Sequence, residues 1–118
     1  MHEFSIAETI VEIAVDEMGK RPPARLTAAR VVIGQLHQIV PDNLIFAFDV
    51  LAEKSAVRGA RLMIREVPVT VACRICRWSG GIDFPVFRCG QCGCGDVEVT
   101  QGRELYLESL EVEDDGQH

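Results

Sequence analysis

The chain has 118 residues, of which 47% are apolar and 25% charged, and its formal net charge is −6 at pH 7. This length excludes a large multidomain enzyme, and the composition can support a hydrophobic core without disulfides. The acidic balance argues against tight, salt-sensitive binding to phosphate backbones, so we expect no nucleic-acid partner.

The amino-terminal region predicts an amphipathic helix. Ser5 and Glu8 have the spacing of a capping box, which places the helix start after Ser5. Apolar residues at helical spacing continue to Met18, and Gly19 is expected to end the helix in a left-handed conformation. Acidic residues interrupt any apolar run long enough for a signal peptide or a membrane span, so we expect a cytoplasmic protein without membrane insertion.

Two elements follow this helix. The apolar run within residues 26–36 predicts a strand. Apolar residues at a spacing of 3.6 then predict a second helix that begins at Pro41 and fades near Lys54.

Two long strand regions flank a block of cysteines. Residues 62–71 alternate as a strand whose phase slips at 65–66, which indicates a bulge, and Pro68 favours a sheet edge. Residues 97–112 alternate again after the cysteines. The simplest topology pairs these two regions antiparallel and places the cysteines at their far end.

The predicted fold is α+β, with two helices packed on a small three-stranded antiparallel sheet and an inserted zinc-ribbon-like module. We expect residues 1–72 plus 97–118 to form one α/β domain and residues 73–96 to form the inserted finger. The finger has too few apolar residues to hold together without a staple.

The cysteines have the spacing of a four-thiolate metal site. Cys73 and Cys76 form one C-x2-C pair, a twelve-residue spacer follows, and Cys89 and Cys92 form a second pair. Two such pairs supply the tetrahedral sulfur shell that zinc prefers, and a closed shell of this kind is structural. Iron also suits four thiolates, so the spacing alone does not decide the metal. Cys94 is surplus to a four-ligand shell and is interpreted as a spare thiol rather than as an alternative ligand.

The amino terminus is a second candidate metal site. Met1, His2 and Glu3 precede the predicted helix cap, so their backbone nitrogens are expected to be uncommitted. The Met1 amine, the His2 backbone nitrogen and the His2 imidazole can bind one ion through fused chelate rings, and Glu3 can complete a square through its backbone nitrogen or its carboxylate. Nickel(II) and copper(II) prefer such planar nitrogen sets.

The remaining polar residues predict no catalytic machinery, so we expect that the protein is not an enzyme. Neither a Ser/His/Asp array nor a phosphate-binding glycine loop is apparent. His37 is interpreted as a loop or helix-edge residue, and Trp78 as a packing residue of the cysteine module rather than a partner contact.

Four segments together resemble the HypA/HybF family of hydrogenase maturation nickel metallochaperones. They are the start Met1-His2-Glu3-x-Ser5, the segment Phe46-Ala47-Phe48, the paired cysteine motifs, and Gly102-Arg103-Glu104-Leu105. The resemblance spans nearly the whole chain. This sequence differs from the family pattern at Gly90, where proline is frequent, and in the presence of Cys94.

The resemblance implies an α/β nickel-binding domain and a zinc domain. It implies transferable Ni(II) at the Met1 amine, His2 and the Glu3 backbone, and structural Zn(II) at Cys73, Cys76, Cys89 and Cys92. The implied partners are the GTPase HypB and the precursor of the [NiFe]-hydrogenase large subunit.

Two alternatives remain open from the residues alone. The cysteine motifs with nearby arginines also suit a nucleic-acid-binding zinc ribbon, which the acidic net charge opposes. Four thiolates also suit a rubredoxin-like electron carrier, which bound zinc in place of iron would exclude.

Overall fold

The computed structural model describes residues 2–114, apart from the side chain of His2. The chain divides into two compact units. The first contains residues up to Val32, Ile39–Arg65, and residues from Tyr106 onward; the second contains Ile33–Gln38 and Glu66–Leu105. The predicted boundaries of the inserted finger, at residues 73 and 96, stay a prediction.

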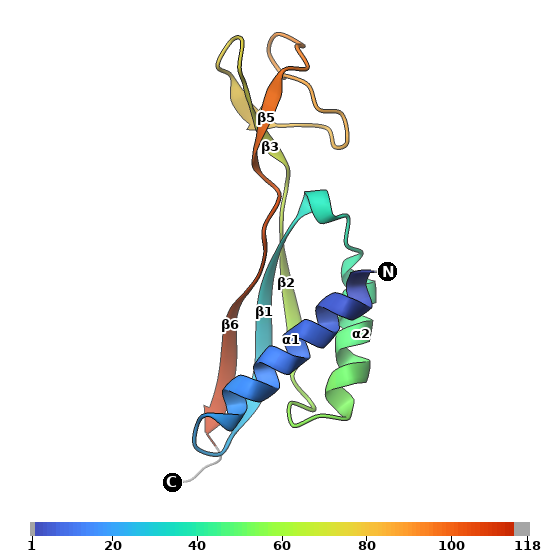
Figure 1. The fold of residues 1–118 in the computed structure, drawn as a ribbon, viewed down its shortest axis with the longest axis vertical. Coiled ribbons are helices and arrows are strands. Elements are labelled where there is room, and N and C mark those ends of the chain that lie inside the picture. Colours follow the sequence, from blue (N-terminus) through green and yellow to red (C-terminus); the bar gives the residue numbers. More distant parts are fainter. Residues whose placement is uncertain (1, 115–118) are drawn as a thin grey trace. The chain divides into compact units, whose positions relative to one another are not determined.

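Helices α1 (His2–Gly19) and α2 (Pro41–Glu53) pack against each other and cover one face of a three-stranded sheet (Figure 1). Each helix buries one apolar face, which contains the following residues: Ala7, Ile10, Val11 and Ala14 in α1, and Leu44, Ala47, Phe48 and Ala52 in α2. The predicted second helix is therefore confirmed. Within residues 2–114, neither helix is long and apolar enough to cross a membrane.

The first helix ends at Gly19, close to the predicted end, but its predicted start and the left-handed conformation predicted for Gly19 were wrong. The helix begins at His2, and Ser5 lies inside it, where its carbonyl accepts a hydrogen bond from the Thr9 hydroxyl at 3.2 Å. Glu3 lies in the first turn, where a negative charge interacts favourably with the helix dipole. Gly19 does not adopt a positive φ, and the last turn instead closes with a hydrogen bond from the Lys20 N–H to the Glu17 carbonyl at 3.2 Å.

The first sheet has the strand order β2-β1-β6, with bounds β1 (Ala24–Gly34), β2 (Arg61–Val67) and β6 (Leu105–Asp114). The central strand β1 carries much of the core, including Leu26, Ala29 and Val32. In Figure 1, β1 and β2 run in the same direction and β6 runs in the opposite direction. The sheet is therefore mixed. The parallel pair β1 and β2 is connected by a crossover that contains α2, whereas a hairpin turn would make the two strands antiparallel.

The second sheet has the order β4-β3-β5, with bounds β3 (Thr70–Cys73), β4 (Ser79–Gly81) and β5 (Val97–Gln101). Both neighbours are antiparallel to β3. The predicted fold class is confirmed, because the chain combines two helices with two small three-stranded sheets.

The predicted pairing of the two long strand regions is only partly correct. β3 and β5 are antiparallel neighbours, with Cys73 opposite Val97. β2 and β6 are not neighbours, because β1 lies between them. The predicted strand 62–71 is broken at Pro68-Val69 into β2 and β3, which belong to different sheets, since proline cannot donate a backbone hydrogen bond.

Two glycines in the second unit allow a close backbone crossing. The Gly34 N–H donates to the Glu104 carbonyl at 2.7 Å, and the Leu36 N–H donates to the Gly102 carbonyl at 3.0 Å. A β-carbon at Gly34 would lie 2.0 Å from the Gly102 oxygen, and Gly102 itself has a φ of 117°. His37, in the short 3-10 helix η1 (Gln35–His37), lies at the same crossing, with its Nε2 2.9 Å from the Arg103 carbonyl.

Candidate metal centre

The two C-x2-C pairs bring four sulfur atoms together in the second unit. The Sγ atoms of Cys73, Cys76, Cys89 and Cys92 all lie within 4.8 Å of one another. The Cys73–Cys92 sulfurs are 3.8 Å apart and the Cys76–Cys89 sulfurs 3.5 Å. A tetrahedral site with zinc–sulfur bonds of about 2.3 Å requires sulfurs roughly 3.8 Å apart. All five cysteines of the chain are free of disulfides, so the four-thiol cluster could hold a zinc ion.

The backbone of each pair points N–H groups at the sulfur of its first cysteine. In the first pair, the N–H groups of Ile75 and Cys76 donate to Cys73 Sγ, both at 3.4 Å. These two bonds orient the Cys73 sulfur.

The second pair repeats this arrangement. The N–H groups of Gln91 and Cys92 donate to Cys89 Sγ at 3.3 and 3.2 Å. Such donors stabilise a thiolate, the form in which cysteine binds metal.

Each pair also ends in a residue with left-handed backbone geometry. The Arg77 N–H donates to the Cys73 carbonyl at 3.1 Å, and the Gly93 N–H donates to the Cys89 carbonyl at 3.1 Å. The φ angles of Arg77 and Gly93 are 70° and 77°. A positive φ suits glycine but is uncommon for arginine, so the first turn keeps this geometry against the preference of its side chain.

The first cysteine of each pair has a lowered pKa. The N–H group of Cys76 is the main cause of the lowered pKa of Cys73. Burial opposes ionisation of Cys89, yet the N–H groups of Cys92 and Gln91, with smaller contributions from neighbouring thiols, lower its pKa to about 6.

The second cysteine of each pair has a raised pKa. The N–H group of Trp78 favours ionisation of Cys76, but burial and the thiols of Cys89 and Cys73 raise its pKa overall. The N–H group of Cys94 likewise favours ionisation of Cys92, while burial and the surrounding thiols raise that pKa to about 12. Metal binding must therefore displace protons from these two cysteines.

Cys94 lies outside the four-sulfur cluster. Its carbonyl accepts a hydrogen bond from the Cys89 N–H at 2.8 Å, and its Sγ accepts one from the Asp96 N–H at 3.3 Å. Both contacts support the local turn that carries the second pair.

At the amino terminus, the structure describes Glu3 but neither Met1 nor the side chain of His2. The Val40 N–H, which immediately precedes α2, donates to Glu3 Oε2 at 3.0 Å. This hydrogen bond is the largest cause of the lowered Glu3 pKa, which is about 2. The Glu3 carboxylate thus connects the first turn of α1 to the start of α2.

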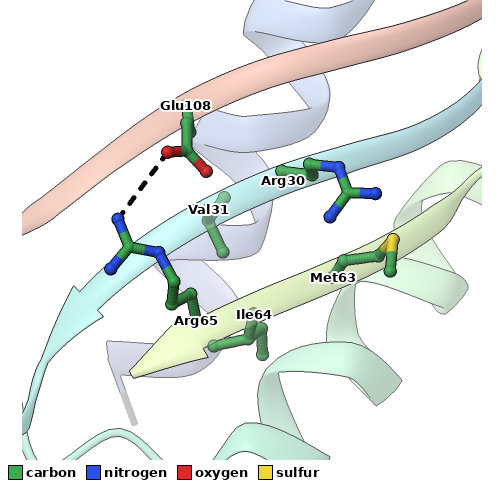
Figure 2. Close-up of a pocket in the computed structure, with 6 residues that line it drawn as sticks. All are labelled: Arg30, Val31, Met63, Ile64, Arg65 and Glu108. Carbon is green, nitrogen blue, oxygen red and sulfur yellow. Dashed lines mark ion pairs between the residues drawn. The ribbon is translucent and has the colours of Figure 1, made fainter. Parts of the chain in front are cut away.

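A shallow pocket of about 130 Å³ lies on the first sheet, lined by Arg30, Val31, Met63, Ile64, Arg65 and Glu108 (Figure 2). Arg65 extends from β2 toward Glu108 of β6, and the two form an ion pair of 3.6 Å. Arg30 forms its own ion pair with Glu111 of β6. These charged groups neutralise one another across the strands, and we assign no ligand to the pocket.

Two helices, two three-stranded sheets and a four-thiol cluster define a small metal-binding protein of the α+β class. A sequence model described as "Hydrogenase/urease nickel incorporation, metallochaperone, hypA" matches residues 1–112. The chain belongs to this HypA family of nickel metallochaperones for hydrogenase maturation, as the sequence resemblance predicted.

Individual relatives agree with this assignment. A "Hydrogenase maturation factor HypA" from Roseiflexus sp. (strain RS-1) is 42% identical over 116 residues, covering 98% of this chain and 94% of the relative. The factor from Chloroflexus aurantiacus (strain ATCC 29366 / DSM 635 / J-10-fl) is 42% identical over 113 residues, covering 95% and 99%.

A solved structure is similar along the whole chain. The solution structure of the Ni metallochaperone HypA from Helicobacter pylori has a TM-score of 0.63 and 26% sequence identity. The similarity covers 98% of this chain and 100% of that one.

Proposed function

We propose that the chain binds Ni(II) through the Met1 amine, the His2 backbone nitrogen and imidazole, and the Glu3 backbone nitrogen. The observation that carries this proposal is the family match, which extends from residue 1 to residue 112 and so includes these three residues. The ion is cargo, bound at an open chain end and passed on during hydrogenase maturation.

The position of Glu3 supports the backbone nitrogen over the carboxylate as the ligand. Its carboxylate accepts the hydrogen bond from the Val40 N–H at 3.0 Å.

The helical backbone at His2 also favours chelation. The ring that joins the His2 and Glu3 nitrogens through one metal contains the His2 Cα–C bond, and a five-membered ring needs this bond near eclipsed. The helical ψ of about −42° is closer to that geometry than an extended ψ of about +135°. Since amide nitrogens bind only after losing a proton, nickel affinity is expected to fall as the pH falls.

We further propose that Cys73, Cys76, Cys89 and Cys92 hold a structural Zn(II). Four thiolates fill the tetrahedral shell and leave no open position for a substrate, which supports a stabilising role and a protein that is not an enzyme. Rubredoxin-like iron is the competing occupant, and a colourless protein with one zinc per chain would exclude it.

The proposed partners are the GTPase HypB and the precursor of the [NiFe]-hydrogenase large subunit, and the proposed location is the cytoplasm. Family membership supports hydrogenase-related partners in general. Copper(II) should bind the same nitrogens more tightly than nickel, so selectivity must come from metal supply and partner recognition.

Nickel titration of His2→Ala tests the proposed nickel site. We expect the variant to bind Ni(II) more than about tenfold more weakly than the wild type, because losing a direct ligand costs at least as much as losing an outer contact. The protein must carry no tag before Met1, since an extension removes the terminal amine.

His37→Ala is the matched control, because its imidazole contacts the Arg103 carbonyl in the second unit. It should keep wild-type nickel affinity. Equal affinities for the wild type and His2→Ala would refute the terminal site.

A further inference from the structure

Trp78, the single tryptophan of the chain, is part of the first cysteine turn through its backbone. Its carbonyl accepts a hydrogen bond from the Cys73 N–H at 2.7 Å. Its own N–H favours ionisation of the Cys76 thiol and so acts to lower the pKa of that group. The backbone of Trp78 therefore affects both cysteines of the first pair.

The indole ring of Trp78 contacts the second cysteine pair instead. A β-carbon added at Gly90, between Cys89 and Cys92, would lie 2.7 Å from Cζ2 and 2.8 Å from Cη2 of the ring. Real β-carbons do not approach other heavy atoms this closely, so the ring rests directly on the Gly90 backbone.

A third segment contacts the same ring. A β-carbon added at Gly80, in β4, would lie 2.6 Å from Cζ2 of Trp78. Two other glycines of this unit are different: β-carbons at Gly81 and Gly95 would meet nothing closer than 4.0 Å. Among these four glycines, a side chain is excluded at the two that lie against the ring.

We propose that Trp78 is a positioning residue for the four-thiol cluster, because it spaces the second cysteine turn against the first. This inference rests on the proposed metal site at these cysteines. The four sulfurs come from two turns that are separated by twelve residues, and the sulfur-directed N–H groups orient each turn only internally. The ring of Trp78 is a rigid contact that links one turn to the other.

A preset distance between the turns strengthens metal binding, because the ion then need not bring the turns together. Ordering two separate segments costs conformational entropy, which is subtracted from the binding free energy. The ring also supplies apolar surface to the second unit, whose buried apolar side chains are few: Ile33, Val69, Val71, Cys73 and Cys89.

The test is a zinc and cobalt(II) titration of Gly90→Ala, with Gly95→Ala as the matched control. The added methyl group must push the ring or the turn aside, so we expect metal affinity to fall about tenfold, as it does when supporting contacts of a ligand are lost. Gly95→Ala adds the same methyl group without meeting the ring and should stay within about twofold of the wild type. Tryptophan fluorescence reports the ring directly, and it should shift in Gly90→Ala but not in Gly95→Ala.

Repeating Gly90→Ala in a Trp78→Leu protein distinguishes loss of the ring contact from nonspecific destabilisation of the cysteine turns. In Trp78→Leu, Gly90→Ala should lower metal affinity by less than about twofold, because the ring that the methyl group would meet is gone. An equal cost of Gly90→Ala in both backgrounds, or an affinity of Gly90→Ala equal to that of Gly95→Ala, would overturn the proposal.

Complete loss of metal binding by Gly90→Ala also tests the proposal. If the Trp78→Leu/Gly90→Ala double variant still binds metal, the proposal is supported. If neither Gly90→Ala nor the double variant binds metal, the proposal is overturned. Failure of the wild type to bind one zinc per chain would instead refute the proposed zinc site.

Discussion

The carboxylate of Glu3 is stabilised in its charged form chiefly by the Val40 N–H, the largest cause of its lowered pKa of about 2. Its ordinary value is 4.5. Because the folded pKa is lower than the unfolded one, the contribution of Glu3 to stability is complete above pH 4.5 and is lost as the pH falls toward 2.

Glu3→Gln tests this linkage in metal-free protein. Glutamine keeps an oxygen for the Val40 N–H but cannot ionise, so the wild type should be more stable than the variant near neutral pH. The difference should shrink steadily below pH 4.5. Denaturant unfolding, followed by helical circular dichroism at several pH values, measures it. A difference that stays constant down to pH 2 would contradict the assigned contact.

At the scale of single residues, the sequence predicted the cluster of Cys73, Cys76, Cys89 and Cys92 because short C-x2-C spacing directly limits where sulfurs can lie. It did not predict the roles of Arg77 or Gly90. The left-handed φ of Arg77 is unusual for a non-glycine residue, so composition gave no signal for it. For Gly90 the sequence did contain a signal. Gly90 lies inside a cysteine pair, and a glycine there lets the ring of the nearby tryptophan approach the backbone.

Among the elements, the junction of β1 and η1 depends on a backbone contact that only glycine permits. A β-carbon at Gly34 would lie 2.0 Å from the Gly102 oxygen and 2.6 Å from the Arg103 nitrogen. Neither backbone atom can move without breaking the hydrogen bonds that the Gly34 and Leu36 N–H groups make there.

We therefore expect Gly34→Ala to reduce the free energy of unfolding by about 3 kcal/mol or more, at the upper end of overpacking costs. Gly19→Ala is the control, because a β-carbon at Gly19 in α1 meets no atom within 4 Å. It should be neutral or stabilise by up to about 1 kcal/mol, since alanine favours a helix. Equal effects of the two substitutions on thermal unfolding would argue against the crossing.

Elements that depend on interactions between residues close in the sequence were predicted better than elements that depend on distant contacts. Helix α2 was predicted well because apolar spacing and Pro41 are local signals. The start of α1 was misplaced because a local capping pattern at Ser5 competed with a contact to Val40, which is distant in the sequence. The strand order β2-β1-β6 also depends on distant pairing, and alternation alone does not reveal which strand lies in the centre.

For the molecule as a whole, metal is expected to matter unequally to the two units. Most of the buried side chains, including Phe48, Leu26 and Leu44, belong to the first unit, and the second unit has few. The first unit can fold on hydrophobic burial, while the second needs the added stability of a bound ion.

Chelation of zinc should therefore unfold the sheet β4-β3-β5 while α1 and α2 remain helical. Trp78 fluorescence reports the second unit, and circular dichroism at the helical band reports the first. Simultaneous loss of both signals would contradict independent stability of the first unit. Zinc affinity should also fall as the pH falls, because the bound thiols must lose their protons. The decrease should be steeper below a pH of about 6, where the Cys89 thiol must also lose a proton to bind zinc.

The closed four-thiol cluster has a consequence for how the protein migrates in an electric field. Four ionised thiolates carry four negative charges and one Zn²⁺ returns two, so the loaded chain has a formal charge of −8, against −6 when every thiol is protonated. The cation makes the chain more anionic because it stabilises the thiolates of Cys76 and Cys92, whose pKa values are raised, while the lowered pKa of Cys89 keeps the change at neutral pH below two charges. In native electrophoresis at neutral pH, the loaded protein should move faster toward the anode than the metal-free protein, which makes occupancy visible without a spectroscopic probe.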